Sequence, residues 1–140
     1  MAVSFCDRFV ILLPTGESQP YGMTERIEHL CIDQATPGRF LFIATNTAVV
    51  QYDLVNRDFH TIDLTLQAPF VANVGRGNIV IHSGQEARLF RVDEDMDRAT
   101  HRVSTPGREV IAALPGPNPG KFTLIDRAGK VTIHDSTPGN

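Results

Sequence analysis

Hydrophobic and polar residues alternate along most of this chain, in short segments that end at polar turns. The segment GKFTLIDRAGKVTIHD, residues 120–135, shows the pattern clearly. Phe122 and Leu124 alternate with polar neighbours before a turn, and Val131 and Ile133 do so after it. Alternation with a period of two is typical of a half-buried strand, and two such strands around a turn predict a hairpin.

The same alternation recurs along the chain, whereas helical periodicity is almost absent. The 11 glycines and 9 prolines divide the sequence into short segments rich in Val, Ile, Phe, Thr and Leu. This pattern predicts an all-β protein: a sandwich, a barrel or a propeller. Residues 23–32 offer charged positions for a short helix, but the alternation of Ile27, His29 and Cys31 favours a strand.

One segment type repeats three times. Gly38, Gly77 and Gly120 each precede a strand-like segment with apolar residues two and four positions after the glycine. These apolar residues are Phe40 and Phe42, Ile79 and Ile81, and Phe122 and Leu124. The glycines are about 40 residues apart, which is the period of a four-stranded propeller blade. We therefore predict blade-like repeats at about 27–64, 70–104 and 110–135.

The number of strands in each repeat carries information about assembly. The first two repeats contain four strand-like segments, whereas the third contains three. One further segment, 8–13, remains at the start of the chain. The interpretation is a single domain over 1–140 with three blades, in which a segment such as 8–13 supplies the missing outer strand of the third blade.

The turns and third strands of these repeats resemble those of WD-repeat β-propellers. In DRAGKVTIHD, His134 and Asp135 stand where that family has Trp-Asp, and ATNTAVVQYD has Tyr52 and Asp53 there. The middle repeat, SGQEARLFRVD, departs from the pattern with Arg91 and Val92. The resemblance implies a propeller with a binding role. The family's Gly-His pair is missing, so its buried His-Asp network is not carried over.

Three blades do not close a ring, because propellers usually have four to eight. An open arc also leaves apolar sheet faces in water, which costs about 25 cal/mol per Å². We therefore expect half of a six-bladed propeller, completed by a homodimer in which segment 8–13 of one chain closes the third blade of the other. Completion by another propeller-forming chain is the variant, and a monomeric β-sandwich or barrel is the alternative fold.

Composition narrows the class of partner. The formal net charge is −3, from 13 basic and 16 acidic residues, which is unlike the basic excess of nucleic-acid-binding proteins. No apolar run approaches the roughly 20 residues that span a membrane, and the first residues lack a signal-peptide pattern. We expect an intracellular, cytoplasmic protein. Cys6 and Cys31 are too few for a disulfide framework, and either free thiols or a single bridge fits them.

Candidate chemistry is sparse, and we expect no metal and no cofactor. The five histidines lack metal-binding spacing. The aspartates at 93, 95 and 97 are spaced as in a calcium loop but lack its glycine and glutamate, so a solvated loop is the more typical reading. Asn73 and Asp126 could line a tunnel, as in metal-dependent propeller hydrolases. Their ordinary roles are to end a strand and to begin a turn.

These observations favour a non-catalytic protein-interaction scaffold and not an enzyme. The alternatives are a propeller that binds a small ligand or a sugar, and a metal-dependent propeller hydrolase. Tyr52, Arg91 and His134 stand at corresponding places in the three repeats. We predict that these three residues contact the partner.

Overall fold

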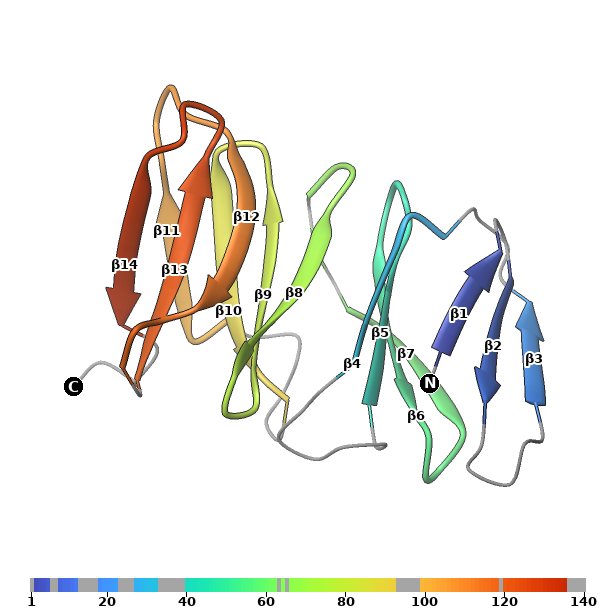
Figure 1. The fold of residues 1–140 in the computed structure, drawn as a ribbon. Coiled ribbons are helices and arrows are strands. Elements are labelled where there is room, and N and C mark those ends of the chain that lie inside the picture. Colours follow the sequence, from blue (N-terminus) through green and yellow to red (C-terminus); the bar gives the residue numbers. More distant parts are fainter. Residues whose placement is uncertain are drawn as a thin grey trace.

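The computed structural model describes residues 2–5, 8–12, 18–22, 27–32, 40–62, 64, 66–92, 99–118 and 120–135. These residues form fourteen strands and, within the described ranges, no helix (Figure 1). The strands form four antiparallel sheets, and each sheet contains strands that are consecutive in the sequence.

The two central sheets have four strands each. The second sheet contains β4 (His29–Ile32), β5 (Phe40–Ala44), β6 (Val49–Asp53) and β7 (Asp58–Ile62). The third sheet contains β8 (Phe70–Gly75), β9 (Asn78–Ser83), β10 (Glu86–Arg91) and β11 (His101–Ser104).

The two terminal sheets have three strands each. The first sheet contains β1 (Ala2–Phe5), β2 (Arg8–Leu12) and β3 (Ser18–Gly22). The fourth sheet contains β12 (Val110–Pro115), β13 (Lys121–Asp126) and β14 (Val131–Asp135).

The four sheets stand side by side in chain order (Figure 1). The first strands of successive sheets contact one another: β1 contacts β4, β4 contacts β8, and β8 contacts β12. This arrangement is an arc of propeller blades and not the two facing sheets of a sandwich. The predicted all-β, blade-like architecture is confirmed, as are four strands in each of the first two repeats and three in the last.

Residues 8–12 form a strand as predicted, but the prediction that this strand is unpaired within its own chain was wrong. We expected a spare strand, but β2 pairs with β1 on one side and with β3 on the other. Residues 2–22 therefore contribute a sheet of their own, and the described residues form four sheets and not three. The sequence hid β3 because Pro20 lies inside it, and proline within a segment argues against a strand.

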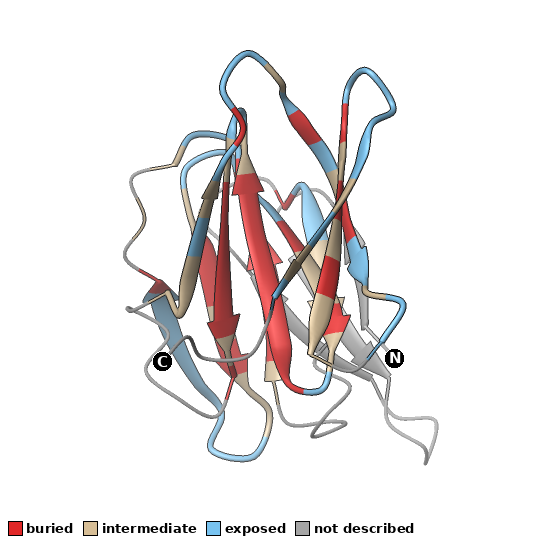
Figure 2. Ribbon diagram, turned by 90° about the vertical axis from the view of Figure 1, so that its left-hand side faces the viewer, coloured by how far each residue is buried: buried red, intermediate tan, exposed pale blue. Residues whose placement is uncertain are grey.

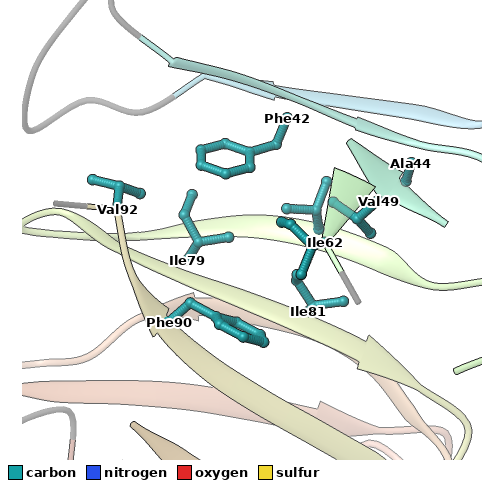
Figure 3. Packing of buried hydrophobic residues seen from close by; sticks show 9 residues of the cluster. Phe42, Ala44, Val49, Ile62, Ile79, Ile81, Phe90 and Val92 are labelled. Atoms are coloured by element: carbon teal, nitrogen blue, oxygen red, sulfur yellow. The ribbon is translucent and has the colours of Figure 1, made fainter. Parts of the chain in front are cut away.

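Apolar side chains fill the spaces between sheets. Phe42, Ala44 and Val49 of the second sheet pack against Ile79, Ile81 and Phe90 of the third (Figure 3). A second cluster joins the third and fourth sheets, with Val80 and Leu89 against Phe122 and Leu124. A third cluster, which includes Leu41, Ile43 and Tyr52, lies on the opposite face of the second sheet.

The fourth sheet lies at the end of the molecule that faces the viewer in Figure 2, and buried residues alternate with partly exposed ones along β13, so one face of the sheet is buried. Phe122 and Leu124 are each 1% exposed and point towards the third sheet. The other face carries large apolar side chains that are 47–57% exposed: Ile111, Leu114, Val131 and Ile133. We call these four residues the open apolar face.

Candidate binding surfaces

The three residues predicted to bind a partner lie on the third strands of three sheets, near the ends of those strands. Tyr52 lies in β6, Arg91 in β10 and His134 in β14. The strand register shows that they are not equivalent. Tyr52 pairs with Leu41 and His134 with Phe122, and the corresponding residue of the third sheet is Phe90, which pairs with Ile79.

Arg91 is therefore displaced by one residue, which places it on the opposite face of its strand. Counting from the glycines caused this error, because the position of the glycine and the length of the hairpin each differ by one residue between repeats. Leu41 corresponds to Ile79, whereas Phe42 lies in the same cluster as Ile79 and packs against it from the neighbouring sheet. The period of the repeat is confirmed, but in the first repeat the strand residues lie one position further from the glycine than in the second.

The environments of Tyr52 and His134 also differ. Tyr52 is 1% exposed, and its ring lies 4.5 Å from that of Phe59, so it packs within the core. His134 is half-buried beside Phe122, and its Nε2 lies 2.8 Å from the Thr132 hydroxyl. Partial burial lowers the pKa of His134, and the nearby Asp135 opposes this shift.

A cleft of about 200 Å³ opens at one rim of the arc, between the third and fourth sheets. The β8–β9 turn forms one side, and the connection between β12 and β13 forms the other. The cleft is lined by Val74, Gly75, Arg76, Asn78, Pro115, Gly116, Pro117, Asn118, Gly120 and Lys121. We call it the rim cleft. Arg91 pairs with Asn78 in the strand register and therefore lies beside this wall of the rim cleft.

Backbone geometry shapes both sides of the rim cleft. Arg76 and Gly77 connect β8 to β9 with φ angles of 55° and 76°, which is the left-handed pair of a type I′ hairpin turn. On the other side, the Gly116 amide donates to the Lys121 carbonyl at 3.0 Å. A Cβ at Gly116 would lie 2.5 Å from the Lys121 backbone, so this approach requires glycine.

The rim cleft combines positive charge with a buried acceptor. Arg76 is exposed, and Lys121 forms an ion pair with Asp135 at the rim. The Lys121 ammonium lowers the pKa of the Asp135 carboxyl. Asn78 is 7% exposed, and its Oδ1 is buried without a hydrogen-bond partner. Sequence reasoning missed Asn78, because an asparagine that begins a strand gives no sign of burial.

The two residues weighed for a tunnel site bind backbone amides close to turns. Asn73 Oδ1 accepts a hydrogen bond from the Gly75 amide at 2.7 Å. Asp126 Oδ1 accepts from the amides of Ala128 and Lys130 at 2.9 and 3.0 Å, and its Oδ2 lies 3.7 Å from Arg108. Asp126 ends β13 and begins the turn, as the sequence indicated, whereas Asn73 does not end its strand but lies within β8, at the shift in register before Gly75.

Within the described residues, no group of three or more His, Cys, Asp or Glu side chains is arranged to hold a metal ion. The aspartates at 93, 95 and 97 lie outside those residues, as does Cys6. Cys31 lies partly buried against the cluster between the second and third sheets.

The fold is that of blades of a WD-repeat-like β-propeller. A chain in a crystal structure of the mitotic checkpoint complex superposes with a TM-score of 0.78 at 14% identity, over 96% of this chain and 43% of that chain. The WD40 repeats of RRP9 give 0.69 at 12% identity, over 91% and 42%. The C-terminal WD40 domain of Sif2 gives 0.61 at 18%, over 92% and 40%.

The chain therefore spans about two fifths of the length of these structures. No family model matches the sequence, and no curated protein matches it. In the part of the chain that the structure describes, no helix is long and apolar enough to cross a membrane.

Proposed function

We propose that this chain is a non-catalytic protein-interaction scaffold that contributes its sheets to a larger propeller. The observation that carries the proposal is the open apolar face of the fourth sheet. The chain also shares its fold with a chain in a crystal structure of the mitotic checkpoint complex. Rigid sheets that present many loops are suited to protein binding. We further propose that it acts inside the cell.

The open apolar face is suited to pack against another sheet. Leu114, Thr123 and Ile133 form one row across the fourth sheet, and Ala112, Ile125 and Val131 form another. The second and third sheets bury the faces that point to the next sheet in the arc. A further sheet on the fourth would remove these side chains from water, at a gain of about 25 cal/mol per Å².

A second copy of the chain is our leading candidate for that sheet, and another propeller-forming chain is the variant. Each copy has four sheets, so a pair would form an eight-bladed ring and not the six-bladed ring expected from three repeats. Rings of four to eight blades are usual. Packing between sheet faces replaces the exchange of residues 8–13, since both edges of β2 are already paired.

The native mass tests this proposal. Light scattering of the wild-type chain should give twice 15.4 kDa. Ile133→Glu should reduce the mass to that of one chain while circular dichroism stays unchanged, because a buried carboxylate opposes sheet packing. Val55→Glu is the matched control, because Val55 is 69% exposed in the β6–β7 turn and lies off the open apolar face. A monomeric wild-type chain would exclude self-completion.

Partner contacts at the rim are a separate part of the proposal. Arg91 and His134 are half-buried near strand ends, where a partner can reach them. Tyr52 is buried in the core, so its replacement would report on packing and not on recognition. We therefore retain Arg91 and His134 as proposed contact residues.

A further inference from the structure

We propose that the rim cleft binds a short acidic peptide segment, through a peptide N–H donated to Asn78 Oδ1 and a carboxylate held by Arg76. This inference rests on the proposed scaffold function and names the kind of segment that one surface of the scaffold recognises. Three features of the cleft support it: a buried acceptor, a strained cationic turn and a small volume.

The buried acceptor is Asn78 Oδ1. Asn78 begins β9, lines the cleft and is 7% exposed, yet its Oδ1 has no hydrogen-bond partner. A buried acceptor without a donor reduces folding stability, and such groups are rare in folded proteins. A ligand that brings an N–H into the cleft would satisfy this oxygen. The backbone of a peptide carries such donors at every residue except proline.

The cationic turn adds a charge preference. Arg76 occupies a left-handed position, with φ of 55°, where Asn or Gly is favoured. It forms no ion pair with any residue that the structure describes. Lys121 also lines the cleft, but Asp135 neutralises its charge. Among the residues that line the cleft, one net positive charge therefore remains, which suits a single carboxylate better than a doubly charged phosphate.

The volume selects the size of the ligand. Sites for drug-sized molecules usually enclose about 300–1,000 Å³, whereas the rim cleft encloses about 200 Å³. Val74, Pro115 and Pro117 provide apolar wall surface. A peptide unit with one acidic side chain suits this space better than a whole small molecule.

The experiment is an NMR titration of the full ¹⁵N-labelled chain with two blocked pentapeptides, acetyl-Gly-Ala-Glu-Ala-Gly-amide and its glutamine analogue. The acidic peptide should give saturable shifts at the amides of Arg76, Gly77 and Gly116 and at the Asn78 side-chain amide. The glutamine peptide should bind at least tenfold more weakly. The absence of saturable shifts, or equal binding of the two peptides, would overturn the proposal.

Two variants separate binding from folding. Asn78→Leu removes the unsatisfied oxygen, and Arg76→Gly relieves the left-handed backbone. Each should retain or raise the melting temperature and weaken the acidic peptide at least tenfold. An asparagine or arginine with only a structural role would instead lose stability on replacement. Undiminished binding by either folded variant would overturn the proposal.

Arg57→Gly is the matched control. Arg57 is also exposed and left-handed, with φ of 60°, but it lies in the β6–β7 turn of the second sheet and not at the cleft. Replacement of Arg57 should leave the affinity for the acidic peptide unchanged. A loss of affinity equal to that of Arg76→Gly would show non-specific charge attraction and would overturn the proposed site. The native mass does not depend on the cleft, so failure of the peptide experiment is distinguishable from failure of the scaffold proposal.

Discussion

Several buried polar side chains of this protein stabilise turns, and their environments decide their chemistry. Asp126 is 6% exposed because two backbone amides and Arg108 surround its carboxylate. It begins the β13–β14 turn, as the sequence predicted. His82 is 3% exposed, and its ring stacks on Phe70 with centroids 5.4 Å apart. No pattern around residue 82 indicated that this histidine is buried between two sheets.

His82 predicts an acid-sensitive stability. Burial lowers its pKa below the usual 6.5, a hydrogen bond with the Val110 backbone opposes the shift, and His29 adds to it. The folded state therefore favours the neutral ring, and its contribution to stability is complete above about pH 6.5 and is lost as the pH falls through the lowered pKa. Urea unfolding between pH 7.5 and 5 should show this loss. His82→Gln should reduce the pH dependence, and an unchanged slope would contradict the assignment.

At the scale of elements, the alternation of apolar residues located the strands well. The strands of the three predicted repeats all form, and the third repeat ends after three. The register between strands was harder to predict, because an offset of one residue moves every side chain to the opposite face of the sheet. Phe42 and Ile81 stand at the same offset from their glycines in the sequence, but they lie in one cluster between neighbouring sheets. The offset of one residue in the first repeat explains why Arg91 was grouped with Tyr52, and a β13–β14 hairpin one residue longer than the β9–β10 hairpin explains why it was grouped with His134.

The packing between the second and third sheets predicts a large effect at Phe42. Phe42 is 0% exposed in the cluster that joins these sheets (Figure 3). Phe42→Ala should reduce the free energy of unfolding by about 3–5 kcal/mol, since it leaves a cavity between two sheets. Phe59→Ala is the control, because Phe59 is 49% exposed, and it should have a clearly smaller effect in urea unfolding. Equal effects would argue against close packing between these sheets.

At the scale of the whole molecule, each sheet depends on its neighbours for burial. The first sheet stands beside the second (Figure 1), where Leu41, Ile43 and Tyr52 are each at most 1% exposed. The fourth sheet shows the alternative, because its outer face has no neighbour among the described residues and keeps four large apolar side chains about half exposed. The ends of the arc therefore govern its assembly.

Removal of residues 1–26 should leave one face of the second sheet exposed to water, as the outer face of the fourth sheet is. The shortened chain would expose the cluster around Leu41, Ile43 and Tyr52. We expect a lower melting temperature and increased binding of a hydrophobic dye, because the exposed apolar area loses its hydrophobic stabilisation. A shortened chain with the wild-type melting temperature and no added dye binding would show that the first sheet does not cover this face.

The sequence by itself determined the all-β class, the period of the repeat and the strands of three blades, because these depend on local alternation and on turn residues. It also identified Asp126 as a turn residue. Only the tertiary structure decided the first sheet, the register between repeats, and the burial of Asn78 and His82. These depend on which faces of separate strands meet, and a period of two within one strand does not specify which neighbour each face contacts.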